Sequence, residues 1–281
     1  MGVVVVTDSS SDLSSASARE YGIDVVPLWV VFGEERLRDG VDIQRSEFYT
    51  RLGQAKDLPH TAPIEEAEFA QVFARHVAAG NDVIAPVISD KLSETYKHAI
   101  SAAQKFPGKV YVVDSQTFSG GLFLHALAAS ELAKSGKSAA EIAKILENAR
   151  ATQHGFFITP DMSYLGRTGR VNKAVVALGT MLKVNPVLRI QNGIVDSAAQ
   201  TRTFEKAREL LVDIVTRELR DIETVRFMVG HANAPEVGAG ELTMLRAKLG
   251  TEPRSLMLYE AGPTVAVHGG PGSLGIFSLV A

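Results

Sequence analysis

The sequence contains no cysteine among its 281 residues. This absence excludes a disulfide framework and any metal site that needs thiolate ligands, and it agrees with a reducing compartment. No apolar stretch approaches the ~20 residues that a membrane-spanning helix needs. No basic segment precedes the first apolar run, as it would in a secretion signal. We therefore expect a cytoplasmic protein with no stable membrane insertion.

The chain also lacks a strong imbalance of charge. It carries 29 Lys and Arg residues against 32 Asp and Glu residues, with a formal net charge of −3. Such a surface provides no field that would attract nucleic acid, so we expect no nucleic-acid partner. The length of 281 residues favours two domains over one, because a single hydrophobic core rarely grows to that size.

One sequence pattern occurs three times: an apolar strand, a turn with Asp and Ser, and a helix. It covers residues 3–13, 81–102 and 110–121. Parallel strands in one sheet would bring the three turns to the same edge, which is where open α/β sheets bind ligands. Each turn alone is an ordinary helix cap. Three together favour a small anion held by hydroxyl and helix N–H groups, with Asp8 and Asp114 bracing the turns.

These patterns predict an α/β fold with a parallel-sheet N-terminal domain at residues 1–160 and an α+β C-terminal domain at residues 161–281. A small β-hairpin insertion is expected at residues 25–60, where the hydrophobic period changes to that of strands. Asn192-Gly193 predicts a type I′ hairpin turn. Two valines and a threonine at residues 264–267 predict a strand that ends just before His268.

Several familiar motifs fail on physical grounds, so we expect neither a cofactor nor a metal. Residues 270–275 fit G-x-G-x-x-G, but the six residues that follow leave no room for a dinucleotide fold. The histidines show no metal-ligand spacing. No nucleophile elbow or paired carboxylates can be found, which makes a binding protein the leading class. His268 remains open between core packing and ligand contact.

A series of short motifs in the chain resembles the DegV family, the bacterial fatty-acid-binding proteins that serve as the lipid-carrying subunit of fatty acid kinase. The resemblance covers nearly the whole chain. The motifs are Thr7-Asp8-Ser9-Ser10-Ser11-Asp12-Leu13, His60-Thr61-Ala62-Pro63, Ser89-Asp90-Lys91-Leu92-Ser93-Glu94-Thr95-Tyr96, Asp114-Ser115, Tyr164-Leu165-Gly166-Arg167-Thr168-Gly169-Arg170-Val171, Asn185-Pro186-Val187-Leu188, Thr201-Arg202-Thr203 and His268-Gly269-Gly270-Pro271-Gly272.

The resemblance implies a long-chain fatty acid buried between the two domains. Its carboxylate would be held by the hydroxyl groups of Thr61 and Ser93, with His268 and the first N–H groups of the following helix close by. Arg170 and Arg202 would lie near the pocket mouth, where an ATP-dependent kinase subunit would dock and form the acyl phosphate. The protein would then be a non-catalytic lipid-binding subunit rather than an enzyme.

Two departures from the family pattern bear on this site. Glu94 stands where glycine is common, so either its charge points away from a bound anion or the site is altered. Gly269 occupies the second position of the glycine-rich turn. Phe118, Phe156, Met181 and Leu182 are expected to shape the pocket. The alternative function is a phosphocarrier, or an enzyme for a small carbonyl substrate, that acts through His268.

Overall fold

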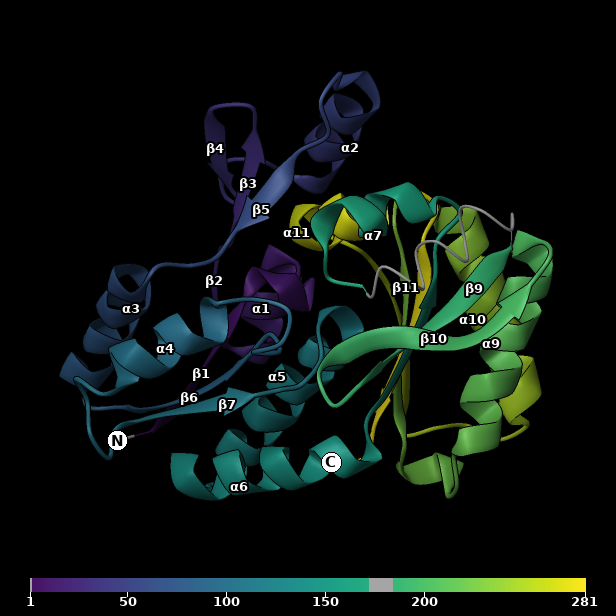
Figure 1. Ribbon diagram of the computed structural model, residues 1–281. Helices are drawn as coiled ribbons and strands as arrows, with labels where there is room; N and C mark the ends of the chain where they lie inside the picture. The colour runs from purple at the N-terminus through teal and green to yellow at the C-terminus, as the bar shows by residue number, and fades with distance from the viewer. Residues whose placement is uncertain (1, 172–183) are drawn as a thin grey trace.

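The computed structural model describes residues 2–171 and 184–281 and contains three β-sheets with helices packed between and around them (Figure 1). The first sheet is parallel, with the strand order β2-β1-β6-β7. Its strands are β1 (Val3–Asp8), β2 (Ile23–Val26), β6 (Asp82–Val87) and β7 (Val110–Asp114). The predicted parallel arrangement of the three repeated units is therefore correct, and their polar turns share one edge of this sheet.

Helices cover both faces of the parallel sheet, which explains why its strands are apolar throughout. On one face lie α3 (Glu66–Ala78) and α4 (Thr95–Ala103), packed against Val6 and Val83. On the other lie α5 (Ser119–Lys134) and α6 (Ala139–Ala149), packed against Val5 and Ile84.

Side chains cap two of the helices at their N-terminal ends. At the start of α6, Ser138 and Glu141 bond each other's backbone N–H groups. Ser14 caps α1 (Ser15–Tyr21), whereas Ser11 belongs to the short 3-10 helix η1 (Ser9–Ser11) and Asp12 is buried.

The insertion forms an antiparallel sheet of three strands that projects away from the parallel sheet (Figure 1). It comprises β3 (Trp29–Phe32), β4 (Glu35–Arg38), α2 (Arg45–Gln54) and β5 (His60–Ala62). The predicted hairpin is thus correct except at its beginning, because Val25 and Val26 belong to β2 of the parallel sheet. Strand β5 pairs with β3 and places Thr61 opposite Val30.

The third sheet has six strands in the order β10-β9-β8-β13-β11-β12. They are β8 (His154–Ile158), β9 (Asn185–Gln191), β10 (Ile194–Thr201), β11 (Arg226–His231), β12 (Ser255–Glu260) and β13 (Leu274–Leu279). Only the β11–β12 pair is parallel. Helices α9 (Phe204–Glu218) and α10 (Pro235–Leu249) pack on the outer face. The predicted type I′ turn is present, since φ is 52° at Asn192 and 78° at Gly193.

Strand β8 bears on the expected domain boundary. It precedes residue 160, yet it hydrogen-bonds to β9 and β13 of the six-stranded sheet. The 3-10 helix η2 (Arg150–Thr152) connects it to α6. Sheet membership therefore favours a division between α6 and β8, before the boundary expected from Pro160 and the glycines that follow it.

The strand expected at residues 264–267 is wrong. This segment belongs to helix α11 (Pro263–Gly269), which packs against β3, β5, α2 and the short helix α7 (Met162–Thr168). Pro263 occupies the first helical turn, where the missing N–H group costs nothing. Two buried carboxylates, described below, accept hydrogen bonds from the N-terminal end of this helix, so tertiary contacts override the β propensity of its valines.

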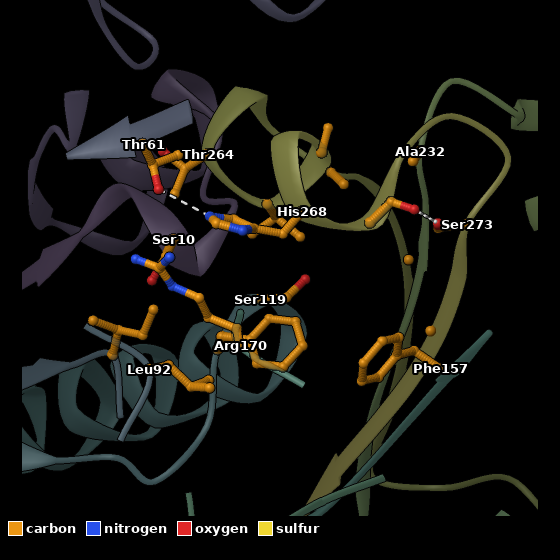
Figure 2. A pocket seen from close by; sticks show the side chains of 18 of the residues that line it. Ser10, Thr61, Leu92, Ser119, Phe157, Arg170, Ala232, Thr264, His268 and Ser273 are labelled. Atoms are coloured by element: carbon orange, nitrogen blue, oxygen red, sulfur yellow. Dashed lines mark hydrogen bonds between the residues drawn. The ribbon is translucent and has the colours of Figure 1, made fainter. Parts of the chain in front are cut away.

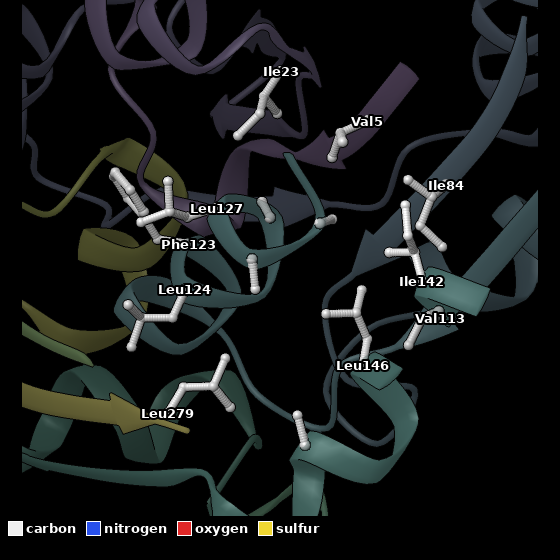
Figure 3. Packing of buried hydrophobic residues seen from close by; sticks show 14 of the residues in the cluster. Val5, Ile23, Ile84, Val113, Phe123, Leu124, Leu127, Ile142, Leu146 and Leu279 are labelled. Carbon is white, nitrogen blue, oxygen red and sulfur yellow. The ribbon is translucent and has the colours of Figure 1, made fainter. Parts of the chain in front are cut away.

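Helix α5 joins the two larger sheets into one structure. Its residues from Ser119 to Ser130 are all buried, because one side of the helix packs on Val5 and Ile84 and the other on Met228 and Phe277 of the six-stranded sheet. Figure 3 shows Leu124 and Leu127 of α5 between Val5 of the parallel sheet and Leu279 of β13.

Among the helices of residues 2–171 and 184–281, none combines the length and the apolar composition that a membrane span requires.

The Asp8 carboxylate connects the ends of two neighbouring parallel strands. It is fully buried and accepts hydrogen bonds from Ser10 N at 3.0 Å and Ile88 N at 2.7 Å. It thus braces the turns, as expected. Asp114 does the same for the next turn, because it accepts from Gln116 N at 2.9 Å.

We predict that Asp8→Ala lowers the free energy of unfolding by about 2–3 kcal/mol, because the Ile88 N–H group is left buried without an acceptor. Urea denaturation measures the change. Asp196→Ala is the control, because Asp196 is exposed, and its effect should stay within about 0.5 kcal/mol. Equal effects of the two substitutions would contradict the bracing role of Asp8.

Candidate functional site

A cavity lies where the polar edge of the parallel sheet meets the insertion, α11 and the six-stranded sheet. It contains about 1120 Å³ of space free of protein atoms, including solvent at its mouth. Ser93 follows β6, Thr61 comes from β5, His268 from α11 and Phe157 from β8.

Polar groups gather where the insertion meets α11 (Figure 2). The Thr61 hydroxyl lies 2.9 Å from Nε2 of His268. Thr61, Ser93, Arg170 and His268, all singled out from the sequence, line this one cavity. Arg202 does not line it: this residue is exposed on the turn between β10 and α9.

His268 lies in the last turn of α11 rather than at the end of a strand. Burial lowers its pKa to about 3, and the charges of Arg170 and Arg167 add to the effect. The imidazole is therefore neutral at pH 7. Its Nδ1 atom is buried and has no hydrogen-bond partner among the described residues, while Nε2 contacts Thr61.

Ser93 lies just before α4 and shares a hydrogen-bond network with the start of that helix. Its hydroxyl donates to Thr95 Oγ1 at 2.9 Å and accepts from Thr95 N at 3.2 Å. Glu94 contributes to the cavity wall, but its carboxylate binds Lys97 Nζ at 3.0 Å and the side chain is 60% exposed. The charge of Glu94 is therefore partly neutralised and solvated.

The rest of the wall is mainly apolar and includes three phenylalanine rings. Phe118 packs edge-on against Phe157 and Phe277, with ring centroids 5.6 and 5.7 Å apart. The expected contribution of Phe118 is thus correct, whereas that of Phe156 is wrong. Successive strand residues face opposite sides of a sheet, so Phe156 packs against α9 and its neighbour Phe157 faces the cavity.

Two further expected pocket residues, Met181 and Leu182, lie outside the described residues. Among those described, no three His, Asp or Glu side chains come together in a way that could hold a metal ion.

Two buried carboxylates, Asp12 and Asp39, hold the beginning of α11. Asp12 accepts from Gly262 N at 2.7 Å, and Asp39 accepts from Thr264 N at 3.1 Å. Asp12 also accepts from the Ser119 hydroxyl at 2.5 Å, and this hydroxyl contacts Tyr259 Oη at 2.6 Å. These bonds link the parallel sheet, the insertion and the six-stranded sheet through the helix that carries His268.

No sequence signal identifies this arrangement. Asp12 and Gly262 are 250 residues apart in the chain. Asp12 stands in a polar turn, and from the sequence its role cannot be distinguished from that of an ordinary helix cap.

Comparisons with known proteins agree with one another. A family model described as an uncharacterised protein of the DegV family matches residues 2–281. A DegV domain-containing protein of Deinococcus radiodurans is 33% identical over 278 residues, which cover 98% of each chain. The structure of a fatty-acid-binding DegV family protein from Thermus thermophilus matches with a TM-score of 0.93, 31% identity and full coverage of both chains. A stearic-acid-binding protein of Eubacterium ventriosum matches with a TM-score of 0.91 and 27% identity, over 98% of this chain and 97% of its own.

The burial of Asp12 leads to a prediction about how folding stability depends on pH. Burial raises its pKa from 3.8 to about 7, despite the hydrogen bonds from Ser119 and Gly262 and the charge of Arg45, which lower it. Between these values the folded state binds more protons at this site than the unfolded state, so the contribution of Asp12 to stability is lost as pH rises from 3.8 towards 7.

Asp12→Asn removes this titration. The stability of the variant relative to the parent should therefore increase from pH 4.5 to 7, by at most about 1.4 kcal/mol per pH unit, and level off above pH 7. Thermal unfolding followed across this range tests the slope. Asp42→Asn is the control, because Arg38 lowers the pKa of the exposed Asp42 to about 2 and no slope is expected above pH 4.5. A constant difference for Asp12→Asn would contradict the assignment.

Proposed function

Because the chain belongs to the DegV family, we propose that it binds a long-chain fatty acid between its two domains and presents the carboxylate to a partner kinase. The partner would be an ATP-dependent fatty acid kinase subunit that forms the acyl phosphate in the cytoplasm, and this chain would be its non-catalytic, lipid-binding subunit. The observation that carries the proposal is a mainly apolar cavity whose polar groups Thr61, Ser93 and His268 are uncharged.

Uncharged donors suit a carboxylate that must react. In the Nε2–H tautomer, His268 donates to Thr61 Oγ1, and the Thr61 hydroxyl proton is then free for the ligand. The Ser93 proton, which is shared with Thr95, would move to the ligand because a charged acceptor forms the stronger hydrogen bond. The carboxylate is then oriented without an ion pair that would reduce its nucleophilicity towards the γ-phosphate of ATP.

The apolar wall would provide most of the affinity. Burial of about fourteen methylene groups at ~0.8 kcal/mol each contributes on the order of 11 kcal/mol. Association costs roughly 4 kcal/mol or more, and each hydrogen bond to the charged carboxylate adds only ~1.5–3 kcal/mol. The acyl chain therefore determines how tightly the ligand binds, and the polar groups determine which end faces the kinase.

The two arginines differ in what supports their roles. Arg170 contributes to the cavity wall and lies between Leu92 and the Thr61–His268 pair in Figure 2, which suits contact with the transferred phosphate. Arg202 is exposed outside the wall, which suits contact with the kinase rather than with the fatty acid.

The alternative, a phosphocarrier or small-carbonyl enzyme that acts through His268, has less support. A phosphoryl acceptor needs an accessible ring nitrogen. In this structure Nε2 is hydrogen-bonded to Thr61 and Nδ1 is buried. A small carbonyl compound would also leave most of the apolar wall without a partner.

Native mass spectrometry of the freshly purified protein should show co-purified long-chain fatty acids at about one per chain. Mild organic extraction should remove them, and added fatty acid should restore the mass. A protein that is empty after purification and also fails to bind added fatty acid would contradict the proposal, and phosphate found on His268 would favour the alternative.

We also predict that Thr61→Ala and Ser93→Ala each reduce acyl-phosphate formation with the kinase subunit by at least about tenfold, while fatty-acid affinity falls less. The expected separation follows from the division of roles, because each substitution removes one hydrogen bond to the carboxylate and leaves the acyl-chain contacts unchanged.

Thr50→Ala is the matched control, since the Thr50 hydroxyl donates only to Ser46 O on the exposed face of α2. Binding is measured by titration with the fatty acid, and turnover by acyl-phosphate formation with ATP. Normal turnover of both Thr61→Ala and Ser93→Ala would refute the head-group assignment.

A further inference from the structure

Two glycines form a pair at the cavity wall on neighbouring strands of the six-stranded sheet. Gly230 of β11 is directly opposite Gly275 of β13 in the antiparallel register. The next strands continue the same row, with Tyr259 beside Gly230 and Phe157 beside Gly275. All four residues line the cavity. The two glycines contribute no side chain of their own, and the rings of Tyr259 and Phe277 lie over them.

Glycine is needed at these two positions because a side chain would not fit, and not because of the backbone conformation. Neither has the positive φ that favours glycine. A Cβ atom on Gly275 would lie 2.8 Å from Cε2 of Phe277, and one on Gly230 would lie 2.5 Å from Cζ of Tyr259. The rings of Phe277 and Tyr259 thus lie close against the sheet where the glycines leave room, and a methyl group would lift them into the cavity.

The glycine pair lies between the polar groups and the phenylalanine rings. Strand β13 leaves the turn after α11 at Ser273, whose hydroxyl donates to Gly269 O, next to His268. From Ser273 to Phe277 the chain advances about 13 Å at ~3.3 Å per residue. Phe277 contacts Phe118, which contacts Phe157, so these rings form the wall at that distance from the head group (Figure 2 shows Phe157).

We infer that Gly230 and Gly275, by letting the Tyr259 and Phe277 rings lie close to the sheet, leave room for the distal part of the acyl chain and thereby select long fatty acids over medium-length ones. The inference rests on the proposed function and adds specificity determinants to it. Tyr259 cannot move aside easily, since its Oη accepts from Gly120 N at 2.9 Å and contacts the Ser119 hydroxyl. Phe277 is held only by packing, so Gly275 is the better position for a test.

The test compares the affinities for stearate and octanoate in delipidated protein. Gly275→Ala should reduce the ratio of stearate affinity to octanoate affinity by about tenfold, because the lifted Phe277 ring obstructs the part of the stearate chain that octanoate does not reach. Phe277→Leu should change the ratio in the opposite direction, since a smaller side chain extends that space. Opposite changes from two neighbouring positions cannot come from general destabilisation.

Gly121→Ala is the control. Gly121 is buried in α5, and a Cβ atom there would lie 2.3 Å from Oγ1 of Thr117; neither residue lines the cavity or touches Phe277 through that atom. This variant should lose thermal stability and keep the affinity ratio of the parent. Thermal unfolding of every variant shows which ones fold, and Phe277→Leu remains informative if Gly275→Ala does not fold.

The outcomes separate the two proposals. Binding of neither acid by the parent protein would overturn the proposed function. Binding by the parent with a ratio that stays unchanged in Gly275→Ala and Phe277→Leu would overturn the specificity inference alone. A change of the same size in Gly121→Ala would assign the effect to core packing and would also overturn that inference.

Discussion

The burial of α5 between two sheets is the constraint on which the rest of the structure depends. A helix that packs on one sheet shows an apolar stripe and a polar face, whereas α5 is buried all round from Ser119 to Ser130. Because both sheets pack on this one helix, their relative position is fixed, and the space left beside its N-terminal end becomes a defined cavity. Phe118 and Ser119, at that end, belong both to the helix and to the cavity wall.

A second set of contacts acts on the polar side of the cavity. Asp12 and Asp39 hold the N-terminal end of α11, and α11 carries His268 at its other end. Burial of carboxylates costs free energy, which is reflected in their raised pKa values. In return, a helix of only seven residues is fixed against three separate parts of the chain. The position of His268 next to Thr61 follows from this arrangement rather than from local sequence.

Together these constraints produce a cavity whose polar groups and apolar wall lie in different parts. Neutral hydrogen-bonding groups lie at one side, and the aromatic rings and the Gly230–Gly275 pair form the wall farther along β13. An amphipathic ligand with a small anionic head and a long apolar chain matches that separation. A compact polar metabolite would use only the first part.

Local sequence patterns were enough to predict the strands and helices with a clear period, the parallel arrangement of the three repeated units, the Asn192-Gly193 turn and the motifs around Thr61, Ser93 and His268. These features depend mainly on near neighbours in the chain. Long-range packing, in contrast, makes residues 264–267 a helix, turns Phe157 rather than Phe156 towards the cavity, and pairs Gly230 with Gly275. Those outcomes depend on strand register and on buried partners up to 250 residues away, which local propensity does not encode.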